Sequence, residues 1–248
     1  MIHSFSEKNV GPLKNFSRGI KLTSSPYIML CDQDDVWLPE KIVKSYQKIS
    51  SFCSSKPALV YCDLMIVNES LDLFSSSYFC YKKIPKTWDK HFIQLLQQNT
   101  VSGCAAIFNR ALLEKATPIP DDAYMHDWWL ALVAKAFGNL KLIDEPLIKY
   151  RQHANNSIGV KKRTLKRIDK QYQCFKSSMM KVEKQAKVFS KSFDVSPQTA
   201  LGKDLVLISS MSALTPLQKV RLWCQRRLDR SHITGRIILL VYLLFSCK

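Results

Sequence analysis

Three aspartates stand within the four residues 32–35, directly after the apolar run 27–31. An uninterrupted apolar run of this length is typical of a strand buried on both faces of a parallel sheet. Ligands of open α/β sheets bind beyond the carboxyl ends of strands, so Asp32, Asp34 and Asp35 stand where a site would form. Crowded carboxylates repel, and Mg²⁺ or Mn²⁺ would keep them ionised and bridge them to substrate phosphates. The alternative is a polar turn in which an aspartate caps the next helix.

A fourth carboxylate, Asp127, directly precedes an apolar helix-like segment, WWLALVAKAFG. Aspartate is a favoured N-cap, which alone would explain a single acid at this position. The adjacent Trp128 and Trp129 are unusual, and we expect at least one ring to face the site or its rim as a platform for a sugar. Asp127 is then placed to act as general base on an acceptor hydroxyl.

The polar stretch KYRQHANNSIG, residues 149–159, contains the third candidate, His153. A single histidine is most often a surface or hydrogen-bonding residue. Its functional interpretation is a neutral imidazole that completes a carboxylate metal site, with Arg151 meeting a phosphate.

Strand-like and helix-like segments alternate around these candidates. The alternation predicts an α/β domain with a mainly parallel sheet. The expected strands are residues 27–31, 58–61, 102–109, 140–143 and 147–150, and the expected helices are 39–52, 88–98, 110–115 and 127–137.

The composition narrows the class of protein. Hydrophobic residues make up 46% of the 248 residues, which excludes a wholly disordered chain. The 8 cysteines form no CxxC pair, so we interpret them as buried or free thiols of a reducing cytosol, not as a disulfide framework or zinc site. No apolar core of signal-peptide length is present at the start, so secretion is not expected.

The net charge of +17 is unevenly distributed. Residues 1–159 hold 18 Lys and Arg against 15 Asp and Glu, whereas residues 160–248 hold 19 against 5. The basic part is therefore a C-terminal extension, which favours an anionic surface as partner, either membrane or nucleic acid. Nucleic acid is disfavoured because the basic residues lack interleaved aromatic platforms or a known binding module.

The extension divides into a heptad helix at about 164–190 and further helices at about 200–247. Apolar residues recur from Leu165 to Phe189 with alternating spacings of three and four, so this helix either docks on the domain or pairs with a second helix in a homodimer. The nine apolar residues 237–245 are too few to span a bilayer, which needs about 20. They fit a helix lying in an anionic interface with Trp223 toward the acyl chains, and equally a core helix.

Five stretches together resemble a known family. In order, residues 9–20, 26–42, 102–113, 126–134 and 150–159 are similar to the family-two glycosyltransferases. They look most like rhamnosyltransferase-type enzymes of bacterial surface-polysaccharide synthesis, over about residues 9–159. The resemblance implies a GT-A-type α/β fold and transfer with inversion of the anomeric centre.

Roles for the acidic residues follow from this resemblance. Asp32 and Asp34 match the carboxylates at the donor ribose and at the metal-bound pyrophosphate, and Asp35 is the adjacent acid. Asp127 matches the proposed catalytic base. His153 matches a late residue that approaches the metal or the diphosphate.

The acceptor side is implied in the same way. Trp128 and Trp129 match aromatic residues there, and Gly103 lies in a small-residue stretch that lines the acceptor cleft, where a missing side chain permits close approach. The implied substrates are a nucleoside-diphosphate sugar and a hydroxyl of a glycan or lipid-linked glycan. Rhamnose as the sugar comes from the resemblance alone.

One part of the family pattern has no counterpart in this sequence. Members normally begin with a strand, a TYN-type loop and a further strand that ends in an acidic pair, and these hold the base and ribose. We therefore expect a partial, N-terminally truncated GT-A domain at 1–159, followed by the helical extension at 160–248. It would act in the cytoplasm, peripheral to the inner face of the membrane. The alternative is an inactive remnant or a membrane-tethered interaction protein.

Overall fold

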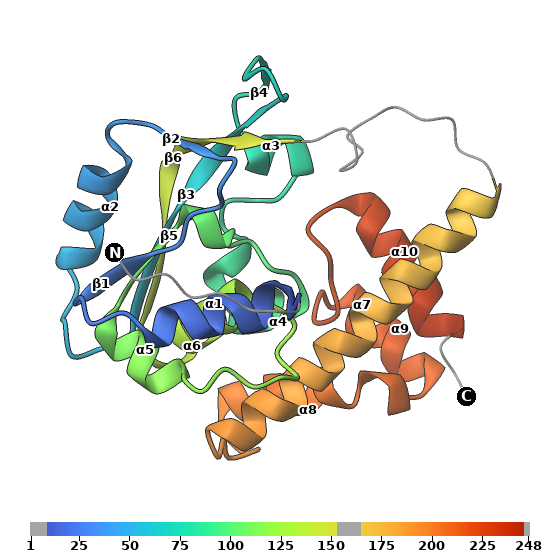
Figure 1. The fold of residues 1–248 in the computed structure, drawn as a ribbon. Coiled ribbons are helices and arrows are strands. Elements are labelled where there is room, and N and C mark those ends of the chain that lie inside the picture. The colour runs from blue at the N-terminus through green and yellow to red at the C-terminus, as the bar shows by residue number, and fades with distance from the viewer. Residues whose placement is uncertain (1–8, 153–164, 246–248) are drawn as a thin grey trace. The chain divides into compact units, whose positions relative to one another are not determined.

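The computed structural model describes residues 9–152 and 165–245. Contacts divide the chain into two compact units (Figure 1). Unit 1 consists of Met1–Tyr81 and Val101–His153, and unit 2 of Lys82–Thr100 and Ala154–Lys248. Residues 82–100 therefore group with the C-terminal helices, although the sequence suggested one continuous front domain up to residue 159.

Unit 1 is an α/β unit, as expected from the alternation of segments. Its sheet has the strand order β1-β5-β3-β6-β2, with β4 paired to β3. The strands are β1 Tyr27–Met29, β2 Val36–Trp37, β3 Ala58–Val67, β4 Leu73–Ser75, β5 Ala106–Asn109 and β6 Asn139–Arg151. The helices are α1 Gly11–Lys21, α2 Lys41–Ser50, α3 Tyr78–Lys82, α5 Arg110–Ala116 and α6 His126–Phe137, with a 3₁₀ turn, η2, at Gly103–Ala105.

The sheet is mixed, and the expectation of a mainly parallel sheet is corrected. Only β3 and β6 pair in parallel among the described strands, whereas β1–β5, β5–β3, β3–β4 and β2–β6 are antiparallel. The strand β3 is buried at nine of its ten positions, so apart from Asp63 it has the apolar sequence typical of a parallel strand. Burial on both faces, not strand direction, produces that sequence pattern.

The two short strands expected at 140–143 and 147–150 are one strand, β6. Its pairing with β3 runs through Cys62↔Ile143 and then Asp63↔Pro146, so two residues of β6 are left out of the register. A bulge of this kind bends a strand without ending it. The polar pair Asp144-Glu145 lies in the bulge, and its polarity made the sequence resemble a break.

Side chains of β3 alternate between the two faces of the sheet. Ala58 and Val60 pack with Ile49 of α2, while α5 and α6 contact β3 as well. The helix α6 leads into β6 through Gly138, where an added Cβ would lie 1.9 Å from the carbonyl oxygen of Pro57. Only glycine permits this close approach, and the turn brings the start of β6 beside β3.

Unit 2 is helical. It contains a 3₁₀ turn, η1, at Trp88–Lys90, α4 Phe92–Gln97, α7 Leu165–Ser192, α8 Ala200–Ser209, a 3₁₀ turn, η4, at Met211–Ala213, α9 Pro216–Cys224 and α10 Ile233–Phe245. In the heptad stripe of α7, Met179, Val182, Ala186 and Phe189 are fully buried, and α7 packs on α4, α8 and α10. Among the described residues, the stripe therefore docks within its own unit.

Residues 82–100 join unit 2 through hydrogen bonds of Gln97. Its side-chain amide donates to the carbonyl of Arg227 at 3.0 Å and accepts from the N–H of Asp229 at 3.0 Å. The helix α10 is half core and half surface, because Leu239 and Leu243 are buried whereas Ile237 is 53% exposed. No helix within residues 9–152 and 165–245 is long and apolar enough to cross a membrane.

Candidate active site

The acidic loop joins β1 to β2, which stand at opposite ends of the strand order β1-β5-β3-β6-β2 of unit 1. The backbone N–H of Arg151 donates to Asp35 Oδ1 at 3.1 Å, and Arg151 Nε donates to the carbonyl oxygen of Asp34 at 2.9 Å. A further guanidinium nitrogen, Nη1, donates to the carbonyl of Glu69. The Arg151 side chain thus fixes the loop backbone, and its expected contact with a phosphate stays a prediction.

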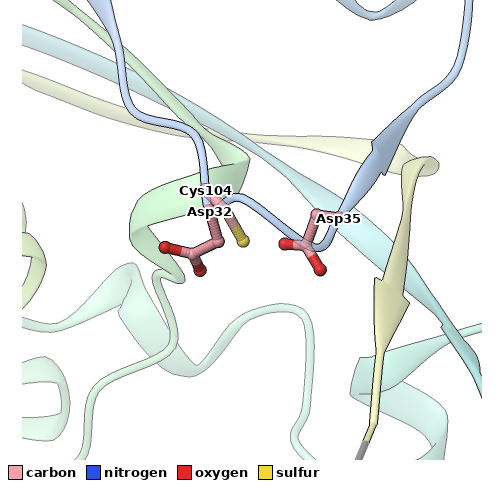
Figure 2. Close-up of side chains that lie close together, drawn as sticks. All are labelled: Asp32, Asp35 and Cys104. Atoms are coloured by element: carbon pink, nitrogen blue, oxygen red, sulfur yellow. The ribbon is translucent and has the colours of Figure 1, made fainter. Parts of the chain in front are cut away.

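Two of the loop carboxylates converge with a thiol. Ligand atoms of Asp32, Asp35 and Cys104 all lie within 4.8 Å of one another, and Figure 2 shows these side chains close together, with Cys104 coming from η2. Asp35 Oδ2 is buried and has no hydrogen-bond partner. Burial raises the pKa of both carboxyl groups, and for Asp32 the neighbouring charge of Asp34 adds to the increase.

This donor set fits a divalent cation only in part. The two carboxylates offer the oxygen ligands that Mg²⁺ and Mn²⁺ prefer, and a cation would satisfy the orphaned Oδ2 of Asp35. The Cys104 thiol is a soft donor whose pKa is raised by burial and by Asp35, so it stays protonated. The expected metal ligands were Asp34 and His153; Asp34 is not in this cluster, and His153 lies outside the described residues.

Asp127 is the second residue of α6 and is held by backbone donors. The N–H of Gly103 donates to Asp127 Oδ2 at 3.1 Å, and the N–H of Trp128 donates to Oδ1 at 2.6 Å. Burial nevertheless raises the pKa of this carboxyl to about 6, with Asp32 adding to the increase. A carboxyl with this pKa is ionised at neutral pH yet basic enough to accept a proton.

Gly103 permits a close approach of two segments, as the sequence predicted, but the segment that approaches it is α6. A Cβ added there would lie 3.1 Å from His126 Nε2 and 3.5 Å from the Cβ of Asp127. The absent side chain lets the turn η2 reach the start of α6, where its N–H holds the Asp127 carboxylate. In this structure the close approach is therefore between two segments of the protein, and an approach by the acceptor stays a prediction.

A cavity of about 260 Å³ joins the two parts of the site. Its lining includes Asp32 and Cys104, two of the three clustered side chains, together with Asp127 and His126 from α6 and Tyr150 from β6. The Tyr150 phenol has its pKa raised to about 12 by burial, so it remains a hydrogen-bond donor. The structure thus brings the acidic loop and the expected base to one small polar space.

The sequence analysis missed His126, the residue before the expected base. Its ring is 3% exposed and stacks on Phe16 of α1 with centroids 4.2 Å apart, but neither ring nitrogen has a hydrogen-bond partner. Burial lowers the pKa of His126 to about 4, which keeps the imidazole neutral. A buried, unsatisfied imidazole costs stability and calls for a ligand. The only signal in the sequence was its position next to Asp127.

A second missed residue is Lys41, at the start of α2. Its side chain is fully buried, and Nζ lies 3.4 Å from the centroid of the Trp37 ring without a hydrogen-bond partner. Burial lowers its pKa to about 8. A lysine in the first turn of a helix opposes the helix dipole, and this was the available signal.

The structure corrects the prediction that Trp128 or Trp129 offers its ring to the acceptor. Trp129 is 1% exposed and its indole N–H donates to the carbonyl of Ala116 at 3.0 Å, so it belongs to the core. Trp128 is 5% exposed, lies beside the ring of Tyr124 and does not line the cavity. The helix α6 is apolar on almost all sides because it is buried, and its aromatic residues fill the interior.

The fold and the site together define a class of protein: an α/β domain with an acidic loop and a buried carboxylate, Asp127, that line one cavity. Residues 2–117 match the family model described as Glycosyl transferase family 2. The chain is also 27% identical over 169 residues to "dTDP-rhamnosyl transferase RfbG" of Shigella flexneri, a match that covers 60% of this chain and 52% of that protein. Residues 2–117 are therefore similar to a family 2 glycosyltransferase domain, which confirms the resemblance, and unit 1 has an α/β fold consistent with the GT-A type. It spans about half the length of the relative it matches.

Proposed function

We propose that this protein transfers a sugar from a nucleoside-diphosphate sugar to a hydroxyl of a glycan or lipid-linked glycan, with inversion at the anomeric carbon. The observation that carries the proposal is the Asp127 carboxylate, which two backbone N–H groups fix beside the cavity that Asp32 also lines. The family match and the raised pKa of Asp127 support the same assignment.

The reaction would be a single displacement. Asp127 accepts the proton of the acceptor hydroxyl while that oxygen forms a bond to the anomeric carbon. The bond from this carbon to the diphosphate breaks on the opposite face, and the nucleoside diphosphate leaves with the electron pair. The acceptor side thus needs one well-placed base, and no covalent intermediate forms.

Asp32 and Asp35, with Asp34 in the same loop, would hold Mn²⁺ or Mg²⁺. When bound, such an ion neutralises the charge that builds up on the leaving diphosphate. The chain's own contribution is the fixed backbone of the loop, which Arg151 ties to the rest of unit 1. The protonated Cys104 beside the carboxylates would act as a hydrogen-bond donor to them.

His126 would bind a sugar hydroxyl in the cavity. A neutral imidazole donates from one nitrogen and accepts at the other, which matches a hydroxyl group. Both nitrogens are buried without partners beside the base, so a bound hydroxyl would satisfy what the protein leaves unsatisfied.

The donor and the cellular context follow the relative. Its name specifies dTDP-rhamnose, so dTDP-rhamnose is the first donor to test. The setting would be bacterial surface-polysaccharide synthesis at the cytoplasmic face of the membrane. Homodimerisation through α7 loses support, because four residues of its apolar stripe, from Met179 to Phe189, are buried within unit 2, whereas Tyr172 and Phe175 are half-buried.

The test is dTDP release from dTDP-rhamnose in Mn²⁺ with a panel of soluble and lipid-linked glycan acceptors. Asp127→Asn should lower acceptor-dependent turnover about 10³-fold, since general bases contribute roughly 10²- to 10⁴-fold. Affinity for dTDP should change less than about twofold. The matched control is Asp122→Asn, an exposed acid of the same segment, which should keep full turnover.

Wild-type turnover should rise with pH up to about 6, where Asp127 becomes ionised, and then level off. Retained turnover in Asp127→Asn would remove the assigned base. A chain inert with every donor, metal and acceptor would instead favour the inactive remnant.

A further inference from the structure

A groove of about 980 Å³ lies on unit 2. It is lined by α7, by the segment from η4 to the start of α9, and by the end of α10. Its apolar lining includes Met180 and Phe245, whose side chains are 58% and 76% exposed. Large apolar side chains that are exposed side by side are typical of a surface that binds a protein, a membrane or an apolar ligand.

Lysines border the groove along one face of α7. Lys176, Lys184 and Lys187 line it together with Met180, and spacings of four, eight and eleven residues bring them to one side of a helix. Glu183 is the acid of the lining, and both of its oxygens accept hydrogen bonds from Ser212, at 2.8 and 3.0 Å. The rim of the groove is therefore positive.

An apolar stripe on α10 continues from the groove. Ile233, Ile237, Val241 and Leu244 are exposed at spacings of four, four and three, and Phe245 belongs to both the stripe and the groove. The helix spans 13 residues, roughly 20 Å, which is shorter than the roughly 30 Å core of a bilayer. It suits a helix lying in the plane of an interface.

We propose that this groove and the stripe of α10 form a docking surface for an anionic phospholipid membrane, with lipid headgroups at the lysines and acyl chains at the apolar residues. Charge complementarity carries the choice, since residues 160–248 hold 19 basic against 5 acidic residues. Nucleic acid would meet the lysines but leave the apolar stripe in water. A second copy of the chain would bring its own positive rim against this one.

The structure corrects the prediction of which aromatic residue lies on the proposed docking surface. The sequence suggested Trp223 toward the acyl chains, but its indole N–H donates to the carbonyl of Arg236 at 3.0 Å. The Arg236 guanidinium lies over the Trp223 ring, 4.8 Å from its centroid. Trp223 therefore joins α9 to α10 inside unit 2, and Phe245 takes the exposed position.

The test uses the full chain and vesicles, without substrates, so it succeeds or fails apart from the transfer reaction. The wild type should co-sediment with phosphatidylglycerol-containing vesicles and only weakly with pure phosphatidylcholine. Combined Lys176→Gln, Lys184→Gln and Lys187→Gln should lower the partition coefficient on anionic vesicles about a hundredfold at low salt. High salt should remove most of that difference.

A second variant tests the apolar contribution. Ile237→Ser with Val241→Ser, both at exposed positions that should not affect folding, is expected to lower binding to anionic vesicles roughly tenfold or more. The matched control carries Lys48→Gln, Lys56→Gln and Lys141→Gln, three exposed lysines of unit 1, and should bind within about threefold of wild type.

Three results would overturn the proposal. One is equal vesicle binding by the groove variant and the lysine control. Another is preference for double-stranded DNA over anionic vesicles in a direct competition. The third is a dimer in sedimentation velocity that Ile237→Ser dissociates, because the stripe would then be covered by a second copy.

Discussion

Buried acidic residues of the two units differ in whether a lysine or arginine forms a salt bridge with them. In unit 2, Asp229 is 1% exposed and lies 2.7 Å from Arg236 Nε and 3.6 Å from Arg226. In unit 1, no lysine or arginine among residues 9–152 and 165–245 forms a salt bridge with Asp32 or Asp35. An acidic residue paired with an arginine or lysine side chain stabilises the fold, whereas an acidic residue without such a pair remains available to a ligand.

Unit 1 also contains a structural acid, which is satisfied by hydrogen bonds instead of a cation. Asp63 is buried, and its carboxylate accepts from the N–H groups of Leu64, Tyr78 and Phe79 and from the hydroxyl of Ser77. Its oxygens are fully used in fixing the start of α3 to β3. Asp35 in the same unit differs from Asp63, because its Oδ2 has no hydrogen-bond partner, and we therefore treat it as the candidate for binding a ligand.

The largest expected effect concerns the paired acid. Asp229→Ala leaves the largely buried Arg236 without its partner and should lower the free energy of unfolding by about 3–5 kcal/mol. Urea unfolding measures it. The control Asp204→Ala breaks a more exposed pair with Arg227 and should cost under about 1 kcal/mol. Equal losses would contradict the contrast between buried and exposed pairs.

The unpaired acid should behave in the opposite way. Asp35→Asn should leave the free energy of unfolding nearly unchanged but weaken Mn²⁺ binding roughly tenfold to a hundredfold, because a carboxylate ligand is lost. Free Mn²⁺ measured by electron paramagnetic resonance gives the affinity. Asp121→Asn, a surface acid, serves as control. Unaltered Mn²⁺ affinity in Asp35→Asn would remove this residue from the metal site.

His126 is an uncharged buried group that, like Asp35, has side-chain atoms without hydrogen-bond partners. His126→Phe should raise the free energy of unfolding by about 1 kcal/mol, because two unsatisfied nitrogens leave the interior. It should also lower kcat/KM for the acceptor roughly tenfold, while His126→Gln keeps part of that activity through its amide. A loss of stability in His126→Phe without a change in kcat/KM would make the residue structural.

A last expected effect is the pH dependence of stability set by Asp127. Its pKa of about 6 lies above the ordinary value of 3.8, so the folded protein binds this proton more tightly than the unfolded chain. The associated stability is complete below about pH 4 and is lost as the pH rises through 6. Between pH 4 and pH 8, Asp127→Asn should therefore lose about 3 kcal/mol less stability than the wild type. Thermal unfolding of both proteins across this pH range measures the difference.

Local sequence predicted the elements well where one physical cause dominates. Apolar runs gave the strands β1, β3 and β5, and the spacing in residues 165–189 gave α7. Strand direction was not predictable, because burial on both faces produces the same apolar run in either direction. The break expected in β6 was wrong because a bulge tolerates polar residues that otherwise end a strand.

The site divides in the same way. The sequence by itself predicted one site for Asp32, Asp34, Asp35 and Asp127, since the order and spacing of whole motifs resemble one family. The structure brings Asp32 and Asp127 to one cavity and places Asp35 beside Asp32. Only the tertiary structure decided that Cys104 joins the acids, that His126 shares their cavity, and that the tryptophans do not. The physical reason is that a residue type gives its chemistry, whereas burial and unsatisfied hydrogen bonds arise from neighbours far along the chain.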